Sequence, residues 1–326
     1  MIRLLANAKI NLYLEIIGDR PDGFHELVMI MQSVALADCI TLRPLKVPAI
    51  RLLCDHPQVP SDHTNLAYRA AGLLQKRFPN RTNQAGGVEI TIDKKIPVGA
   101  GLAGGSANAA AALFGLNVLW QIGLTRIELQ ELGAELGSDV PFCLAGGCAI
   151  ATGRGENVDS LPKVPSLCAV LAKYNSLSVS TPWAYKAYRQ QFERTYLSLK
   201  NTASLAERQA RIHSGEMVRA IATHASATIG SHLHNDLEKV VLPAHAKVAQ
   251  LKETMTAASA AAGGIGTMMS GSGPTVFTLC ETLEQANQIA QTVRSQMSDR
   301  DLQLQVAPFA SQGIQVVESD IGHRPH

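Results

Sequence analysis

Pro97-Val-Gly-Ala-Gly-Leu-Ala-Gly-Gly-Ser-Ala-Asn108 is the stretch from which the fold can be worked out. It follows Val88–Ile92, whose alternating residues predict a strand with one wet face, and it leads into Ser106–Trp120, an alanine-rich run that predicts a helix. Glycines let a backbone turn with positive φ and approach a ligand, and a helix start adds unpaired N–H donors and partial positive charge. The pattern therefore predicts an anion site, most commonly for phosphate.

Two known phosphate-binding patterns fit this loop in part. Gly99-x-Gly101-x-x-Gly104 matches the dinucleotide fingerprint, but the preceding strand carries charges, and no clear acidic residue ends a second strand about 20 residues later. As a P-loop, the stretch has the right length and final hydroxyl, but Gly105 stands where the lysine belongs. The cation for a γ-phosphate must then come from elsewhere in the chain. A tight turn that binds no ligand is the alternative.

A second glycine loop, Ser270-Gly271-Ser272-Gly273-Pro274, precedes a predicted strand at Thr275–Leu279. By itself it is typical of a plain turn. Together with the first loop, it is interpreted as a second wall of the same phosphate pocket.

Composition narrows the class of protein without indicating its chemistry. The 326 residues suggest about two domains. A hydrophobic content of 46% and a charged content of 17% exclude a disordered polyelectrolyte. The net charge of +2, from 29 basic and 27 acidic residues, is too mild to indicate a nucleic-acid partner. The uncharged run Ile96–Thr125 is long enough to span a membrane, but its proline, glycines and asparagines favour a loop and helix in water.

The cysteines and the first residues bear on the compartment. None of the six cysteines has CxxC spacing, so neither a redox dithiol nor a zinc site is indicated, and free thiols are expected. Polar residues at 7, 9, 11 and 15 interrupt the apolar start, unlike a signal peptide. We expect a cytoplasmic monomer or weak dimer whose partner is a small-molecule substrate, with no nucleic acid and no membrane.

The apolar pattern along the chain predicts an α+β fold in two domains, with a boundary near Val164. We expect domains at 1–164 and 165–317 and a tail at 318–326. The predicted strands lie at 12–17, 27–36, 39–45, 88–92, 167–172, 275–279, 302–309 and 314–317, and the predicted helices at 65–78, 106–120, 125–136, 237–258 and 282–298. The polar stretch 183–217 is expected to form a solvated helical hairpin at the surface.

Three segments together are more specific than any one of them. Ala8-Lys9-Ile10-Asn11-Leu12, the loop at 97–108 and the loop at 270–274 resemble, in order and spacing, the three motifs of the GHMP kinases. Further matches to the branch of that superfamily whose acceptor is cytidine diphosphate methylerythritol are Arg20-Pro-Asp-Gly-Phe-His-Glu26, Gly137-Ser-Asp-Val-Pro-Phe142, Ser180-Thr-Pro182 and Asn235-Asp-Leu-Glu238. The resemblance covers roughly residues 5 to 315.

The resemblance implies a fold and a reaction. The fold is the two-domain GHMP kinase fold, with a left-handed βαβ unit in the N-terminal domain and a ferredoxin-like C-terminal domain. The reaction is phosphorylation of the 2-hydroxyl of the methylerythritol unit by ATP with Mg2+, in the non-mevalonate isoprenoid pathway. The ATP loop comprises Pro97, Val98, Gly99, Ala100, Gly101, Leu102, Ala103, Gly104, Gly105, Ser106 and Ala107. Ser106 is the candidate contact to Mg2+.

The same resemblance assigns the catalytic pair. Asp139 matches the aspartate that accepts the proton of the attacking hydroxyl, and Lys9 matches the catalytic lysine. A cation beside Asp139 keeps the carboxylate ionised and favours the developing alkoxide. By residue type alone, Asp139 is better explained as a helix cap, and Lys9 as a solvated lysine at a strand edge.

Substrate contacts are assigned to Asn11, Phe24 and His25. An aromatic ring can stack on cytosine, and an imidazole can hydrogen-bond the edge of the base. Phe24 stands where many relatives have tyrosine, and Ala103 where many have glycine. A methyl at Ala103 is tolerable if its φ is negative. Asn65 and Asp93–Lys95 are further candidates for the nucleotide end, and a simple turn histidine is the alternative for His25.

Two other functions remain open at this point. One is a GHMP kinase that acts on another small alcohol, which would leave Phe24 and His25 without a base to recognise. The other is a non-catalytic nucleotide-binding module, which would need neither Lys9 nor Asp139.

Overall fold

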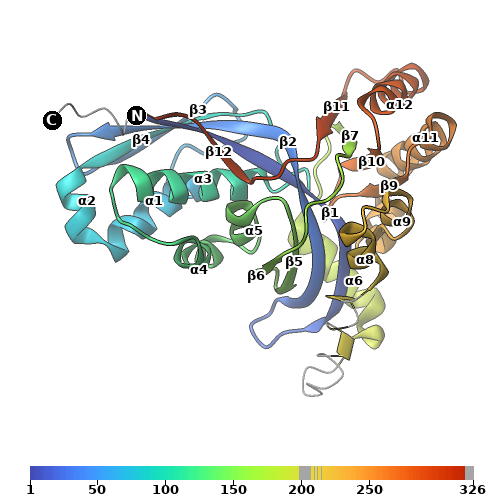
Figure 1. Cartoon of the computed structure of the whole chain (residues 1–326), viewed down its shortest axis with the longest axis horizontal. Helices are drawn as coiled ribbons and strands as arrows, with labels where there is room; N and C mark the ends of the chain where they lie inside the picture. The colour runs from blue at the N-terminus through green and yellow to red at the C-terminus, as the bar shows by residue number, and fades with distance from the viewer. Residues whose placement is uncertain (198–206, 209, 211, 214, 320–326) are drawn as a thin grey trace.

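The computed structural model describes residues 1–197, 207–208, 210, 212–213 and 215–319. Two sheets organise them (Figure 1). The larger sheet has the order β12-β1-β2-β4-β3, with β5 and then β6 continuing from β2, and β8 beside β1. Its strands are β1 (Ile2–Asp19), β2 (His25–Leu45), β3 (Ile50–Cys54), β4 (Gly87–Asp93), β5 (Cys148–Gly153), β6 (Asn157–Ser160), β8 (His234–Asn235) and β12 (Ile314–Ser319).

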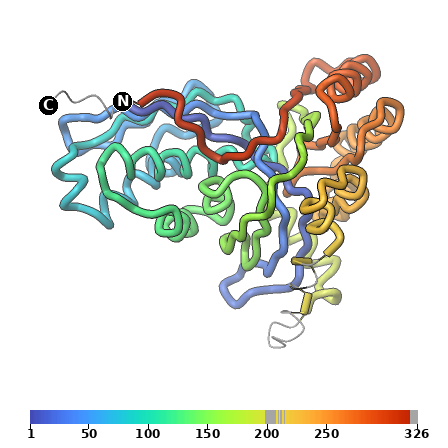
Figure 2. Tube along the Cα trace, viewed as in Figure 1, coloured from blue at the N-terminus to red at the C-terminus, as the bar shows by residue number. Residues whose placement is uncertain are grey.

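Strands β1 and β2 form a long hairpin within the larger sheet, and the far end of this hairpin reaches the part of the molecule that carries α6 (Figure 2). The two strands have 18 and 21 residues, longer than the separate short strands that the sequence predicts here. Most of β1 is buried on both faces, so the chain needs no strict alternation to stay extended. A register shift between Asn7 and Ala8 leaves two residues of β2 without partners in β1, which interrupts the pattern there.

Helices α1 (Leu66–Arg77), α4 (Arg126–Leu136) and α5 (Val140–Ala145) surround α3 (Gly104–Leu119), which lies against β1 and β2. Its alanines at 107 and 109–112 are all buried. A Cβ added at Gly115 would lie 2.4 Å from a methyl of Leu42 and 2.7 Å from one of Leu4. Small side chains on α3 therefore let the helix, and the glycine loop at its start, sit close to the sheet.

The crossover unit of the larger sheet is β3, α1, α2 (Pro79–Ala85) and β4. Strands β3 and β4 are parallel neighbours, and the two helices connect them. The left-handed sense implied by the resemblance stays a prediction.

The smaller sheet has the order β11-β7-β10-β9, and all its neighbouring strands are antiparallel. Helices α11 (Ala246–Ala262) and α12 (Leu283–Gln296) pack against it. The chain visits a strand, helices, two strands, α12 and a last strand, which is the ferredoxin-like arrangement. Its strands are β7 (Cys168–Tyr174), β9 (Gly266–Met269), β10 (Val276–Cys280) and β11 (Leu302–Pro308). The predicted α+β GHMP fold is confirmed.

The last strand departs from the predicted domain limits. Strand β12 pairs antiparallel with residues Ile2–Ala6 of β1, so 314–317 return to the larger sheet instead of ending the second domain. The strand also continues through Ser319, into the residues expected to be a tail. Pairing with β12 covers a backbone edge of β1 that would otherwise be open. Residues 320–326 lie outside the described part of the chain.

The stretch expected to be a solvated hairpin is only partly described. It begins with α6 (Thr181–Phe192) and a short 3-10 turn (Glu193–Thr195), and α8 (Glu216–Ala222) begins at its end. Ala184 and Tyr188 on α6 are buried, so this helix is not a fully solvated element, and the expectation is wrong for it. Helices α9 (Ser226–Ser231) and α10 (Glu238–Ala244) follow α8. No helix among the described residues combines the length and apolar character that a membrane span requires.

Candidate active site

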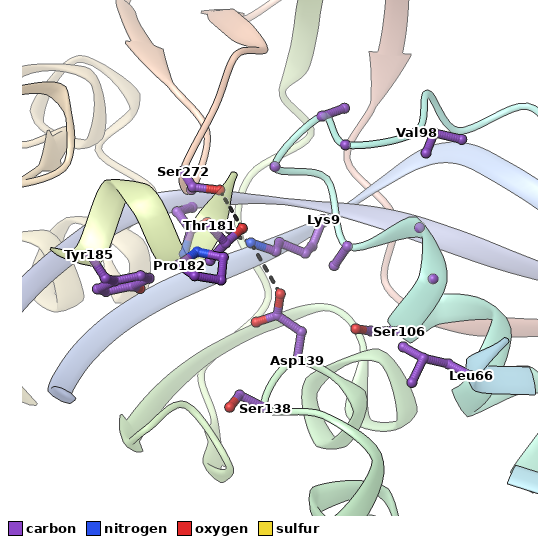
Figure 3. Close-up of a pocket in the computed structure, with 18 of the residues that line it drawn as sticks. Lys9, Leu66, Val98, Ser106, Ser138, Asp139, Thr181, Pro182, Tyr185 and Ser272 are labelled. Atoms are coloured by element: carbon purple, nitrogen blue, oxygen red, sulfur yellow. Dashed lines mark hydrogen bonds and ion pairs between the residues drawn. The ribbon is translucent and has the colours of Figure 1, made fainter. Parts of the chain in front are cut away.

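A cavity of about 960 Å³ lies between the two halves of the chain. Its walls come from β1, β2, the segment 58–66, the first glycine loop, the turn before α5, Arg154, α6 and the loop between β9 and β10 (Figure 3). Segments far apart in the sequence therefore share one site.

The first glycine loop forms one wall. Gly99 and Gly101 have φ values of +60° and +74°, which glycine adopts at little cost. No side chain caps the start of α3, so the N–H groups of its first turn remain available beside the cavity, which Gly104, Gly105 and Ser106 line. The positive end of this 16-residue helix therefore faces the cavity and can bind an anion.

Ala103 has a φ of +56° and a ψ of +30°, in the left-handed region. The condition under which a methyl at this position would be tolerable, a negative φ, is therefore not met. The reason is the sharp turn that joins the loop to α3, since Ala103 is the residue immediately before the helix.

A buried ion pair between Asp38 and Lys94 fixes the residues that lead into the first glycine loop. Asp38 on β2 is fully buried, and its carboxylate accepts hydrogen bonds from Lys94 Nζ at 2.6 Å and from the N–H groups of Lys95 and Ile96 at 2.7 and 2.8 Å. Lys94 Nζ also donates to the Ile96 carbonyl. A Cβ on Gly104 would lie 2.9 Å from that Nζ atom. Asp38 falls between the strands predicted at 27–36 and 39–45, so the sequence did not single it out, although a lone charge between two apolar runs was a signal for it.

Lys9 and Asp139 meet beside this loop. Lys9 on β1 is 4% exposed, and its Nζ donates to Asn11 Oδ1 at 2.7 Å and lies 3.6 Å from Asp139 Oδ2. The two β1 residues share a face because side chains alternate along a strand. The backbone N–H of Lys9 donates to Leu102 O at 3.2 Å, which ties the strand to the glycine loop.

Asp139 occupies the first position before α5, but its side chain makes no capping hydrogen bond there. The cap that offered an alternative explanation for this residue is therefore not formed. Its carboxylate instead faces Lys9 (Figure 3). Ser106 lies on the neighbouring helix start, and its hydroxyl is 4.0 Å from the position of a Cβ on Gly137, two residues before Asp139.

The second glycine loop closes the same region. Gly271 lines the cavity, and a Cβ on it would lie 3.4 Å from Lys9 Nζ and 3.3 Å from Asn11 Oδ1. Ser272 also lines the cavity, and its hydroxyl is 2.8 Å from that of Thr181 on α6. The two glycine loops touch, since Ser270 Oγ donates to the Gly101 carbonyl at 3.0 Å. They are adjacent walls of one pocket.

The far end of the cavity is aromatic. Phe24, at the tip of the β1–β2 hairpin, is 49% exposed, and the Arg154 guanidinium lies 5.1 Å from its ring centre. His25 is buried, with its ring centre 5.0 Å from that of Tyr185 on α6. Sequence reasoning missed Tyr185 and Arg154, although Ser180-Thr-Pro182 marked the start of the helix that carries Tyr185.

His25 presents a neutral, partly unsatisfied imidazole. Burial, and secondarily the Arg189 guanidinium, lower its pKa below the ordinary 6.5, while Asp19 opposes them. Its Nε2 faces Asp19 Oδ1 at 3.4 Å and has no hydrogen-bond partner among the described residues. A neutral imidazole can both donate and accept a hydrogen bond.

The structure brings most of the predicted site residues to the cavity. Lys9, Asn11, Phe24, His25 and Asp139 all line it. Within the two loops, Leu102, Ala107, Ser270 and Gly273 do not line it and serve packing or turn geometry instead. Of the further nucleotide candidates, Asn65 and Lys94 line the cavity, whereas Asp93 and Lys95 form an ion pair away from it.

Comparisons with known proteins agree with this geometry. Residues 65–147 match the family model described as GHMP kinases N terminal domain, and residues 217–299 match GHMP kinases C terminal. The chain is 60% identical over 313 residues to the 4-diphosphocytidyl-2-C-methyl-D-erythritol kinase of Gloeothece citriformis (strain PCC 7424), which covers 96% of this chain and 97% of that one. It is 57% identical to the kinase of the same name from Nostoc sp. (strain PCC 7120 / SAG 25.82 / UTEX 2576), covering 97% and 98%.

Solved structures add the three-dimensional likeness. A crystal structure of 4-(cytidine 5'-diphospho)-2C-methyl-D-erythritol kinase matches with a TM-score of 0.71 and 30% identity, over 94% of this chain and 99% of that one. Homoserine kinase from Cytophaga hutchinsonii ATCC 33406 matches with the same TM-score at 20% identity, over 97% of each chain, and shows the shared fold alone. The chain belongs to the 4-diphosphocytidyl-2-C-methyl-D-erythritol kinase family of the GHMP kinases.

Proposed function

We propose that this protein transfers the γ-phosphoryl group of ATP to the 2-hydroxyl of 4-diphosphocytidyl-2-C-methyl-D-erythritol, a step of the non-mevalonate isoprenoid pathway. The observation that carries the proposal is the meeting of Lys9, Asp139 and two glycine loops in one cavity. Relatives at 57–60% identity over nearly the whole chain bear the name of that kinase.

The phosphate end of the cavity supplies positioning and charge. The N–H groups at the start of α3 and around Gly99–Gly101 cradle the ATP phosphates, since aligned donors at a helix start attract anions. Lys9 replaces the cation that the first loop lacks. It lies against both loops, through Leu102 O on one side and Gly271 on the other.

The reaction then needs one proton acceptor. Asp139 takes the proton of the 2-hydroxyl as that oxygen bonds to the γ-phosphorus, and the bond from the γ-phosphorus to its bridging oxygen breaks to release ADP. Lys9 stabilises the negative charge on the attacking oxygen and on the transferred group. Asn11 fixes Lys9 Nζ through its 2.7 Å hydrogen bond and lines the cavity where we place the acceptor.

The residues present fit a magnesium ion held mainly by nucleotide. Mg2+ commonly binds one or two protein ligands, the substrate phosphates and several waters. Among the described residues, no group of three or more His, Cys, Asp or Glu side chains is placed to hold a metal. Ser106, at the helix start beside the first glycine loop, would contact the ion together with the ATP phosphates. When bound, Mg2+ neutralises phosphate charge.

The aromatic end accounts for the cytidine of the acceptor. Phe24 and Tyr185 offer ring faces, and the neutral His25 offers a hydrogen-bonding edge. An acceptor without a base, as in the homoserine kinase of the same fold, would leave this end of the cavity unused. We therefore favour the cytidine substrate over another small alcohol or a non-catalytic module.

We also propose a cytoplasmic monomer or weak dimer that needs no nucleic acid or membrane. The mild net charge of +2 supports the absence of a nucleic-acid partner. Sedimentation across a concentration series tests the oligomeric state.

Incubation with ATP, Mg2+ and a panel of alcohols tests the function. The panel contains the cytidine diphosphate substrate, mevalonate, homoserine and shikimate, and ADP release is followed. We expect fast release with the cytidine substrate and near-background release with the rest. Preference for an alcohol without a base would overturn the substrate assignment, and no release with any alcohol would overturn the kinase assignment.

A further inference from the structure

The segment Asn235-Asp-Leu-Glu238 is left without a part in the chemistry described so far. We propose that Asn235 is a positioning residue, which holds the second glycine loop against Lys9 and thereby sets the rate of phosphoryl transfer. The inference rests on the proposed function for its effect on rate, but the anchoring itself can be measured separately.

The Asn235 carboxamide uses both its donor and its acceptor groups. Its Nδ2 donates to the carbonyls of Met269 and Gly271, each at 2.8 Å, and its Oδ1 accepts from the N–H of Leu237 at 3.0 Å. The residue is 4% exposed. A carboxylate of the same shape has no donor for two carbonyls, and an apolar side chain would leave both carbonyls unpaired by this residue. Asparagine is therefore well matched to this position.

The anchor is itself fixed to the strand that carries Lys9. Asn235 lies on β8, which pairs parallel with β1, where it is the partner of Leu14. The neighbouring Asp236 donates its N–H to Leu14 O at 3.0 Å and accepts from the N–H of Ile16 at 2.8 Å. The distance between the loop and Lys9 is thus set through a short, buried path along β1.

Hydrogen bonds of Glu238 support the same loop from a second side. Glu238 Oε1 accepts from the N–H of Met269 at 2.8 Å, and Oε2 accepts from Lys252 Nζ at 2.6 Å. Met269 is thereby held by its carbonyl through Asn235 and by its N–H through Glu238. The chain leaving β9 has little freedom before it reaches Gly271.

Asn235 positions Gly271, the part of the second glycine loop that lies closest to Lys9. Gly271 approaches Lys9 Nζ and Asn11 Oδ1 so closely that a Cβ would lie within 3.4 Å of both. If the loop moves away, Gly271 no longer restricts the position of the Lys9 ammonium group. A displacement of about 1 Å in a catalytic geometry can lower a rate about 100-fold.

Asn117 provides a matched control. Its Nδ2 donates to Leu124 O at 3.0 Å and its Oδ1 accepts from the N–H of Leu124 at 2.9 Å, which closes the turn between α3 and α4. It is thus a second asparagine that ties a loop through its carboxamide, but it does not line the cavity. Asn117→Ala removes a similar set of hydrogen bonds away from Lys9.

The experiment compares Asn235→Ala, Asn235→Ser and Asn117→Ala with the wild-type enzyme. We expect the Asn235 variants to lower kcat about 10- to 100-fold, with KM for ATP and for the acceptor near wild type. Asn117→Ala should lower the melting temperature with kcat unchanged. Asn235→Ser keeps the test available if Asn235→Ala does not fold. An unchanged kcat in an Asn235 variant, or an equal loss in Asn117→Ala, would overturn the proposal.

Hydrogen exchange separates this inference from the proposed function. In an Asn235 variant, the amides of 266–273 should exchange faster than in the wild type, whereas Asn117→Ala should leave them unchanged. Unchanged exchange there refutes the anchor whatever the enzyme phosphorylates. Faster exchange in a protein whose wild type phosphorylates no alcohol would keep the anchor and refute the kinase.

Discussion

The two ends of the cavity are lined by different parts of the chain, one mainly by backbone groups and the other by side chains. At the phosphate end, backbone N–H groups, glycines and the buried Lys9 form the walls. At the aromatic end, which we call the base end because we place the cytidine base there, the walls are side chains, and Phe24 is half exposed at a hairpin tip. A surface made of backbone is changed by moving the chain, whereas a surface made of side chains is changed by single substitutions. Mutations at the two ends should therefore affect different kinetic constants.

The largest effect is expected at the catalytic pair. Asp139→Asn removes the proposed proton acceptor and the charge that faces Lys9 with almost no change of shape. It should lower kcat about 100- to 10,000-fold, because a positioned acid–base group contributes that much. KM for ATP should stay near wild type, since the glycine loops are untouched. Steady-state kinetics and calorimetric titration with ATP check both values, and turnover near wild type would remove Asp139 from the role of base.

The next effect is expected in the first glycine loop. Gly104→Val should raise the Kd for ATP more than tenfold, because the new Cβ would lie 2.9 Å from Lys94 Nζ and 3.0 Å from an Ile96 methyl carbon. The added side chain pushes the loop away from the Asp38–Lys94 pair that supports it, and the helix start moves with the loop.

Gly105→Ala is the matched comparison for Gly104→Val. Its Cβ would meet only a Leu66 methyl among its near protein neighbours, at 3.7 Å, which is ordinary contact. Its effect on ATP affinity should be smaller. If Gly105→Ala weakens ATP binding more, the nucleotide lies directly on that residue, and the support beneath the loop is not what decides affinity.

At the base end, His25→Ala should raise KM for the cytidine substrate about tenfold, the equivalent of one hydrogen bond of about 1.4 kcal/mol, and leave KM for ATP unchanged. His245→Ala is a control outside the cavity. A rise in KM for ATP in place of the acceptor would show that the two ends have been assigned in reverse.

The titration of His25 sharpens this prediction. Since its pKa is lowered below 6.5, chiefly by burial, the imidazole is neutral at pH 7 and protonates only in more acidic solution. KM for the acceptor should be level above pH 6.5 and rise as the pH falls below the lowered pKa. His25→Ala should lack this rise, and a rise that persists in the variant would assign the titration to another group.

The smallest effect is expected at Ala103, in the backbone of the phosphate end. Its left-handed φ costs roughly 1–2 kcal/mol for a residue with a Cβ, against roughly 0.5–1 kcal/mol of additional chain entropy lost by glycine. Ala103→Gly should therefore raise the melting temperature by about 1–3 °C. Calorimetry measures the shift, and a lower melting temperature would show that the methyl group stabilises the loop.

Local patterns predicted the phosphate end better than the base end. Glycines and a helix start form an anion site from neighbouring residues, so the stretch at 97–108 could be recognised in isolation. Tyr185 and Arg154 approach Phe24 and His25 from more than a hundred residues away. Asp38 was missed for the same reason, because its partners at 94–96 lie just past the end of β4, more than 50 residues further along the chain.

The sequence by itself determined the glycine-rich loop, the helices around it and the α+β class, whereas the lysine and the aspartate were assigned through the resemblance to the GHMP kinases. The loop, the helices and the fold class depend on residues within one or two turns of each other, where spacing and backbone preference act directly. The tertiary structure decided that Lys9 faces Asp139, that Ala103 is left-handed, that β12 returns to the first sheet and that Asn235 holds the second loop. Each of these depends on the register of long strands and on packing between distant segments, which no local pattern encodes.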